Sequence, residues 1–184
     1  MNQYFDLKDI LHEVRQSKMY SEQFERVQNF KLNSLKELCG RLPVDNEIFF
    51  LETRKSFTAF TFIVYVIKEC GYVKNLFVAT YSTNIRIINA ILKWKSKGLI
   101  GTIHFHISET LKFRMPEIFA RLVELAKDGV ITLTYAWTHK KVACLETDNG
   151  CYVIEGSGNY GKNALEEQYV FLKSKKVYEF RIGN

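Results

Sequence analysis

Short apolar runs alternate with amphipathic segments from Glu47 onward. The apolar runs are Ile48–Leu51, Leu76–Tyr81, Ile100–Ile107 and Val130–Trp137. The segments between them have helical length and cover Ser56–Cys70, Asn84–Lys97 and Pro116–Asp128. Such alternation is typical of β-α repeats, in which consecutive strands pair in parallel and helices cover them. The pattern therefore predicts an α/β fold with a mostly parallel central sheet covered by helices.

A glycine follows each of the three predicted helices directly. Gly71, Gly98 and Gly129 suit the left-handed conformation in which many helices end, and Pro116 suits a first helical turn. The helix boundaries therefore agree from both ends. In the middle helix the isoleucines fall on one side and the basic residues fall largely elsewhere. We expect this helix to cover the sheet and to expose a basic, solvated face.

The segment from Asp6 to Cys39 has a different character. It carries leucines and aromatic residues among many charges, shows no β-branched alternation, and ends near Gly40 and Pro43. These features predict two helices. We therefore divide the chain into an N-terminal helical extension, residues 1–45, and an α/β domain, residues 46–184.

The composition indicates one well-packed domain with a basic surface. A chain of 184 residues with 47% hydrophobic content can bury a substantial core. Lysine and arginine outnumber the acidic residues by 26 to 20, which gives a formal charge of +6 and a pI near 9.1. This charge would attract a polyanion such as nucleic acid or an anionic membrane surface, although many proteins that bind neither carry as much.

The cysteines and the apolar segments indicate the cellular compartment. The four cysteines have no CxxC pair and no regular spacing, so we expect buried thiols in a reducing compartment. The longest apolar stretch, Phe57–Ile67, is shorter than the roughly 20 residues that a membrane-spanning helix needs. The first residues do not resemble a secretory signal. We expect a soluble, cytoplasmic protein with no stable membrane association.

Candidate chemistry is concentrated after the fourth apolar run. The relevant segments are His139-Lys140-Lys141, Thr147-Asp148-Asn149-Gly150 and Gly156-Ser157-Gly158-Asn159. The Asn149-Gly150 pair between apolar runs is a strong signal for a two-residue hairpin turn. With these two turn residues, counting back along both strands sets Lys141 near Gly158. The hairpin therefore brings the His-Lys pair beside the Gly-Ser-Gly-Asn segment.

The residue types in this hairpin suit a phosphoryl group. Side chains at i and i+2 share a strand face, so His139 and Lys141 project together. The lysine supplies charge, Ser157 and Asn159 supply hydrogen bonds, and the glycines allow a ligand to approach closely. The segment Asn163–Gln168 looks helical, and a helix beginning there would add backbone N–H groups to the anion site.

The order His-x-Lys followed by Gly-Ser-x-Asn resembles the HKD motif of the phospholipase D superfamily. The preceding β-α repeats also resemble the half-domain of that family, so the resemblance covers about residues 47–175. It implies that His139 is the nucleophile, which forms a phosphohistidine, and that Lys141 binds phosphate oxygens. The other residues implied are the acidic residue that orients the histidine and the members of the phosphate pocket: Glu167, Gly156, Ser157 and Asn159.

Two features depart from the family pattern. The usual aspartate, five residues after the lysine, is Glu146 here. Strand alternation puts Glu146 on the face opposite His139 and Lys141, so its change should affect structure rather than chemistry. The spacing to Gly156 is also longer, which a slightly extended hairpin absorbs. Neither departure removes a reacting group.

The chain has a single His-x-Lys, whereas the two-step displacement of the family uses two histidines. Single-motif members are of similar length and dimerise, so the resemblance implies a homodimer that places His139 of each subunit at one pocket. We expect a metal-independent phosphodiesterase without a cofactor, acting on DNA or RNA. Two alternatives stay open: a non-catalytic nucleic-acid-binding module of the same fold, and a phospholipid phosphodiesterase. The positive charge favours nucleic acid.

The remaining histidines and the tryptophans are weaker candidates. His104 and His106 share a strand face, but no Cys, Asp or Glu lies at ligand spacing, so we expect no metal site there. Trp94 and Trp137 lie within apolar segments and not within a basic loop, so we expect both in the core.

Overall fold

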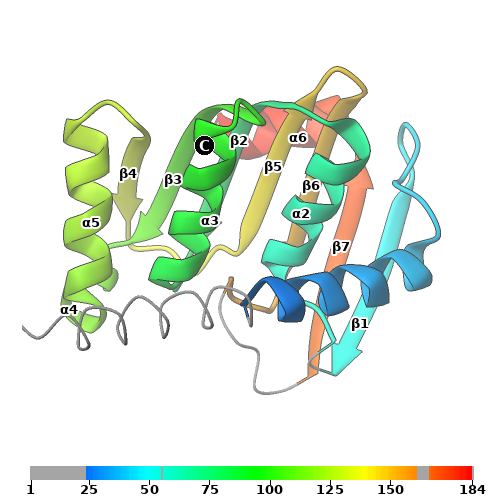
Figure 1. Cartoon of the computed structure of the whole chain (residues 1–184), viewed down its shortest axis with the longest axis horizontal. Coiled ribbons are helices and arrows are strands. Elements are labelled where there is room, and N and C mark those ends of the chain that lie inside the picture. The colour runs from blue at the N-terminus through cyan, green and yellow to red at the C-terminus, as the bar shows by residue number, and fades with distance from the viewer. Residues whose placement is uncertain (1–23, 55, 161–165, 184) are drawn as a thin grey trace, which may run out of the picture.

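The computed structural model describes residues 24–54, 56–160 and 166–183. A seven-stranded sheet has helices on both of its faces (Figure 1). The strands are β1 (Ile48–Arg54), β2 (Val73–Thr80), β3 (Ile100–Ser108), β4 (Thr132–Ala136), β5 (Val142–Thr147), β6 (Gly150–Gly156) and β7 (Glu166–Lys173). The helices are one over residues 24–39, α2 (Ala59–Cys70), α3 (Ile85–Ser96), α4 (Leu111–Arg114), α5 (Pro116–Lys127) and α6 (Lys175–Ile182).

The sheet is mixed. Its strand order is β1-β7-β6-β5-β2-β3-β4, with parallel pairing between β2 and β3 and between β3 and β4. The other four neighbouring pairs are antiparallel. The predicted α/β class is confirmed, whereas the expected parallel arrangement holds only for β2, β3 and β4. The rest differs because the β5–β6 hairpin and the returning strand β7 pair antiparallel, and an apolar run does not encode strand direction.

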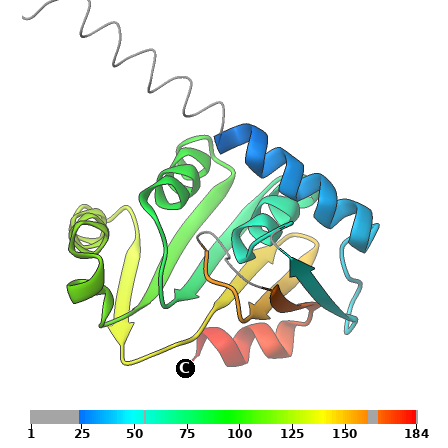
Figure 2. The same cartoon turned by 90° about the horizontal axis from the view of Figure 1, so that it is seen from below.

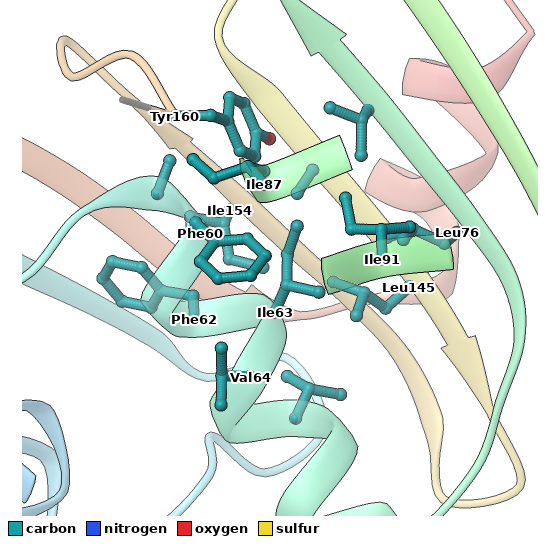
Figure 3. Close-up of a cluster of buried hydrophobic side chains, with 14 of the residues drawn as sticks. Phe60, Phe62, Ile63, Val64, Leu76, Ile87, Ile91, Leu145, Ile154 and Tyr160 are labelled. Atoms are coloured by element: carbon teal, nitrogen blue, oxygen red, sulfur yellow. The ribbon is translucent and has the colours of Figure 1, made fainter. Parts of the chain in front are cut away.

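The helices cover the two faces of the sheet unequally. Helices α2, α3 and α5 lie on one face, and α6 covers part of the other (Figures 1 and 2). The main core lies under α2 and α3, where Ile63, Ile91 and Leu145 belong to one buried cluster (Figure 3). A smaller cluster under α6 contains Cys144 and Val153. Leu145 and Cys144 are adjacent in β5 but serve opposite faces, as strand alternation requires.

The predicted β-α elements are confirmed, with α2 beginning three residues later than expected. Gly71, Gly98 and Gly129 have φ values of +76°, +72° and +69°, the left-handed conformation predicted for the helix ends. At the start of α3, the Asn84 side chain accepts a hydrogen bond from the backbone N–H of Ile87 at 3.1 Å. No helix in the described part of the chain is long and apolar enough to cross a membrane.

The helix over residues 24–39 packs against the α/β domain. Leu32 and Leu35 are buried within the same core as α2 and α3. Lys36 also forms an ion pair with Glu69 near the end of α2. This described part of the predicted N-terminal extension therefore shares the domain core. The first of the two predicted helices, from Asp6, lies outside the described residues.

The β5–β6 hairpin differs from prediction by a register shift of two residues. Thr147 pairs with Gly150, so the turn residues are Asp148 and Asn149 instead of Asn149 and Gly150. The Thr147 hydroxyl stabilises this turn, because it accepts from the Asn149 N–H at 3.1 Å and donates to the Gly150 carbonyl at 2.9 Å. A two-residue shift leaves every side chain on the same face of the sheet, so the predicted facing of the hairpin side chains remains valid.

The four cysteines are free thiols, and only Cys144 is fully buried. The other three, which we expected to be buried, are partly exposed. Burial raises the pKa of the Cys144 thiol to about 12 and that of Cys39 to about 11. Both thiols are therefore protonated and unreactive near neutral pH.

Candidate active site

Three separate segments bring the candidate residues to one edge of the sheet, toward which Figure 2 looks. The carboxyl ends of β1 to β4 and β6 meet there with the amino ends of β5 and β7. The segment with His139 and Lys141 joins β4 to β5, Ser157 follows β6, and Glu167 lies at the start of β7. Ligands of open α/β sheets bind most often at the carboxyl ends of the strands.

His139 and Lys141 lie in direct contact. The Nζ atom of Lys141 is 3.0 Å from Nδ1 of His139 and also donates to the His139 carbonyl at 3.4 Å. An ammonium group can only donate, so Nδ1 accepts this hydrogen bond and a neutral ring carries its proton on Nε2. The predicted His-Lys pair is therefore brought together, with the imidazole held in a defined orientation.

The His-Lys pair lies beside the Gly-Ser-Gly-Asn segment through backbone contact. The N–H of Gly156 donates to the carbonyl of Lys141 at 3.2 Å. Ser157 is then fixed by β7: its N–H donates to the Gln168 carbonyl at 3.1 Å, and its Oγ accepts from the Gln168 N–H at 3.1 Å. The serine hydroxyl is thus held at the sheet edge by backbone groups.

Glu167 contacts the serine and not the histidine. The Ser157 hydroxyl donates a hydrogen bond to Oε2 of Glu167. Among the described residues, Glu167 makes no hydrogen bond or ion pair with His139. Its role in orienting His139 stays a prediction, whereas its contact with Ser157 is a feature of the site that sequence reasoning did not foresee.

The segment after Ser157 is anchored in the core. Tyr160 is 1% exposed and belongs to the same buried cluster as Ile87 of α3 (Figure 3). Its burial raises the pKa of the phenol well above the ordinary value. Asn159 has a buried Oδ1 that finds no hydrogen-bond partner in the described part of the chain. Such an acceptor is normally satisfied by a protein group, a water or a ligand.

The helix predicted over Asn163–Gln168 is only partly described. Glu166, Glu167 and Gln168 belong to β7, where they pair with β1, so the prediction is wrong for these three residues. Residues 163–165 lie outside the described part of the chain. Pairing with an edge strand overrides the helical preference of the Glu-Glu-Gln sequence.

The charge on Lys141 is only partly compensated. Burial lowers the pKa of its ammonium group, and the carboxylate of Glu167 offsets part of that effect. No described carboxylate lies within ion-pair distance of Lys141. The site therefore offers a poorly compensated cation beside a hydroxyl and an imidazole, an arrangement that suits a bound oxyanion.

Tyr81 and Arg114 extend the site beyond the predicted residues. The ring of Tyr81 lies 4.3 Å from the ring of His139, measured between centroids. The guanidinium of Arg114 lies 4.2 Å from the centroid of Tyr81. The signal for both was positional: Tyr81 directly follows β2, and Arg114 ends the short helix α4 that follows β3. Both segments emerge at the same sheet edge as His139.

Glu146 lies on the other face of the sheet, as predicted. Its Oε2 accepts a hydrogen bond from Nδ2 of Asn75 at 2.5 Å and from the hydroxyl of Tyr178 in α6 at 3.5 Å. It makes no described contact with His139 or Lys141. Glu146 therefore connects β5 to its neighbouring strand and to α6.

We expect the substitution Glu146→Ala to destabilise the protein without removing its chemistry. Loss of a partly buried charged acceptor leaves two donors unpaired, which lowers the free energy of unfolding by about 1–3 kcal/mol. Urea unfolding would measure this loss, and the folded variant should keep the phosphodiesterase activity that the sequence predicts within about two-fold of wild type. A fully stable variant that has lost cleavage would contradict the prediction.

His104 and His106 bind the same threonine. Nε2 of His104 lies 2.8 Å and Nδ1 of His106 lies 2.9 Å from the hydroxyl of Thr134 on β4. Burial lowers the pKa of both imidazoles. The described residues contain no group of three His, Cys, Asp or Glu side chains that could hold a metal. These contacts with Thr134 give both histidines a structural role between β3 and β4.

The prediction for Trp137 is wrong. Trp94 stacks on Phe60 at a centroid distance of 5.4 Å and packs against the core, as expected. Trp137 is 78% exposed. It directly follows the last residue of β4, so the apolar run that contains it continues past the sheet.

Comparisons with known proteins find similarity of fold. No protein-family model matches the sequence, and no curated protein matches it significantly. The polyphosphate kinase from Porphyromonas gingivalis has a TM-score of 0.55 at 15% identity, over 74% of this chain and 25% of that chain. The archaeal chromatin protein TrmBL2 has a TM-score of 0.49 at 13% identity, over 96% and 64%. A phosphatidylserine synthase from Haemophilus influenzae has a TM-score of 0.46 at 11% identity, over 74% and 36%.

The likeness to polyphosphate kinase shows the class of fold. Polyphosphate kinase belongs to the phospholipase D superfamily. The chain spans about a quarter of the polyphosphate kinase chain, so the likeness concerns one part of that enzyme. The protein therefore has an α/β fold similar to that of the phospholipase D superfamily, as the sequence predicted.

Proposed function

We propose that the protein is a metal-independent phosphodiesterase that hydrolyses phosphodiester bonds of nucleic acid. The observation that carries this proposal is the contact between His139 and Lys141 at 3.0 Å, and the backbone hydrogen bond from Gly156, the neighbour of Ser157, to Lys141 supports it. A nucleophilic nitrogen, a cation and a hydroxyl converge there at the carboxyl ends of the strands. These are the groups that covalent phosphoryl transfer requires.

The reaction would proceed in two displacements at phosphorus. First, Nε2 of His139 attacks, a P–N bond forms, and the P–O bond to the leaving group breaks as that oxygen takes a proton from a second histidine. Next, water attacks phosphorus and gives a proton to that second histidine, and the P–N bond breaks to release the product. Lys141 would bind the phosphate oxygens throughout, and Ser157 and Asn159 would hydrogen-bond to them.

The contact of Lys141 with His139 supports a role for substrate in activating the nucleophile. While Nδ1 accepts from the ammonium, the proton of a neutral ring occupies Nε2 and blocks attack. Phosphate oxygens entering the site would draw the ammonium toward themselves. The ring proton could then move to Nδ1, and the lone pair of Nε2 would face phosphorus.

The second histidine would come from a second copy of the chain. His104 and His106, the other histidines in the described part, bind Thr134 instead of the site. An exposed apolar side chain near the site supports this proposal: Phe50 of β1 is 80% exposed and lines a hollow of about 610 Å³ together with Gly156. Large exposed apolar side chains beside a site favour an interface. We therefore propose a homodimer.

The proposal is tested by cleavage of end-labelled single- and double-stranded DNA and RNA in excess EDTA. We expect cleavage that survives chelation, and a covalent protein–nucleic acid adduct that is stable to alkali after rapid denaturation. Sedimentation of the same preparation should give a dimer. Salt-sensitive binding without cleavage would favour a non-catalytic module, and hydrolysis of phospholipid vesicles alone would favour a lipid phosphodiesterase.

The pH dependence of kcat/KM should reflect the protonation of Lys141. Burial lowers the pKa of its ammonium group below the ordinary 10.5, and lysine binds phosphate only when it is charged. We therefore expect kcat/KM to fall on the alkaline side at a pH below 10.5. In Lys141→Arg the guanidinium stays charged, so the alkaline fall should move to higher pH even where the maximal rate is lower. The same alkaline limb in both proteins would contradict this assignment.

A further inference from the structure

An exposed aromatic and basic surface lies beside the candidate active site. It consists of two aromatic side chains and three basic side chains, here called the rim: Phe113, Trp137, Lys112, Arg114 and Lys140. Phe113 is 77% exposed and Trp137 is 78% exposed. Aromatic rings of this size are normally among the most deeply placed side chains of a domain, so two of them in solvent at one place call for a partner.

A backbone contact places the segments that carry the two aromatic residues side by side, next to the site. The N–H of Glu109, just after β3, donates to the carbonyl of Ala136 at the end of β4, at 3.0 Å. The chain leading into α4 therefore runs beside the chain leading to Trp137. Trp137 lies two residues before His139, which limits the distance between their Cα atoms to about 7 Å.

On the other side of the rim, α4 reaches the site through Arg114. Its guanidinium lies over the ring of Tyr81, and that ring contacts His139. Phe113 is the neighbour of Arg114 in the chain, and the ammonium of Lys112 lies 5.9 Å from the centroid of Phe113. The rim therefore continues directly from the catalytic pair.

The cations of the rim are available to an anion. Ion pairs occupy basic residues elsewhere on the surface, yet Lys112, Arg114 and Lys140 make none with a described carboxylate. The acidic residues that flank α4 in the chain are Glu109 and Glu117. With the site included, Lys141 brings the cations to four and Glu167 brings the carboxylates to three, so the edge retains a positive balance.

We propose that the rim binds unpaired nucleotides, so that the site acts on single-stranded nucleic acid. This inference rests on the proposed function and names its substrate class. Exposed aromatic rings offer faces on which bases stack, and interspersed cations follow the phosphate backbone. Bases within a duplex are already stacked on each other and reach such rings only after extrusion. The rim therefore selects unpaired strands by stacking, independently of sequence.

The test measures binding of DNA to the full chain in a His139→Ala background, in which cleavage does not consume the ligand. The sequence contains two tryptophans, and Trp94 is stacked on Phe60. A single-stranded oligonucleotide should therefore quench mainly Trp137. We expect Trp137→Leu and Phe113→Leu each to weaken single-strand binding by about ten-fold, with much less effect on a duplex of the same sequence at the same salt concentration.

Phe30→Leu is the matched control, because Phe30 is 69% exposed but lies on the helix over residues 24–39. It should bind single strands as the parent does. Equal affinity for single strand and duplex, or unchanged binding by both rim variants, would overturn the inference. So would binding only to anionic phosphatidylglycerol vesicles, or resistance of Trp137 to acrylamide quenching before DNA is added. If the wild-type protein binds single strands through Trp137 but cleaves no substrate, the proposed role of the rim is supported and the proposed phosphodiesterase activity is contradicted.

Discussion

His139→Ala should reduce EDTA-resistant cleavage by at least about ten-thousand-fold, because it removes the atom that we propose as the nucleophile at phosphorus. The proposed phosphate-binding groups, Lys141 and Ser157, remain in this variant, so KM should change far less than kcat. The effect is expected to be larger than that of removing either binding group alone. Quenched-flow cleavage of labelled oligonucleotide, with a search for the covalent adduct, measures both consequences.

His104→Ala provides the control for the loss of an imidazole. His104 lies on β3 and hydrogen-bonds to Thr134, without contact to the site. Its substitution should keep cleavage within about two-fold of wild type. Circular dichroism and urea unfolding would establish that both variants fold. Adduct formation by folded His139→Ala protein would refute the assignment of the nucleophile.

The fold was predictable where local pattern and packing agree. The apolar runs that became β2 and β3 and the helices that end at Gly71 and Gly98 were read from periodicity and from glycine positions. These signals are local, because a buried face and a left-handed helix end each constrain a few consecutive residues. Strand direction depends on pairing between distant segments, so no local sequence signal indicated the antiparallel pairing of β7 with β1.

The hairpin illustrates a similar limit at short range. The Asn149-Gly150 sequence predicts a turn at those residues, but the hydroxyl of Thr147 stabilises a turn one residue earlier, which shifts the strand register by two residues. Since the side-chain period of a strand is two, this error left the facing of Glu146 correct. The contact of Lys141 with His139 was likewise predictable from i, i+2 spacing.

Other parts of the site depend on contacts between distant segments. Nothing in the sequence around Tyr81 or Arg114 indicates that Arg114 stacks on Tyr81 and that Tyr81 contacts His139. Their positions follow from which strands end at the same edge, and that requires the strand order. The exposure of Trp137 was missed for a local reason: the apolar run that contains Trp137 does not indicate where the strand ends.

Gly156→Ala should damage both stability and catalysis, because position 156 has no space for a side chain. An added Cβ would lie 2.4 Å from the carbonyl oxygen of Gln168 and 2.5 Å from Cδ1 of Tyr169. The obstacle is backbone in a paired strand and a ring buried in the core, so neither moves aside easily. We expect the free energy of unfolding to fall by about 1–3 kcal/mol or more, as for other forced overpacking.

Catalysis should fall further than this loss of stability explains. Relief of the clash requires β6 to move away from β7, and the two backbone contacts of Ser157 with Gln168 hold the serine in the site. Gly71→Ala is the matched control, because it strains a left-handed backbone by about 1–2 kcal/mol without any atom in the way. Gly71 lies just before the amino end of β2, at the opposite end of that strand from the candidate active site. If folded Gly71→Ala and Gly156→Ala lose stability equally and cleavage equally, the close approach at Gly156 has no role in placing Ser157; loss of cleavage in Gly156→Ala alone means that it does.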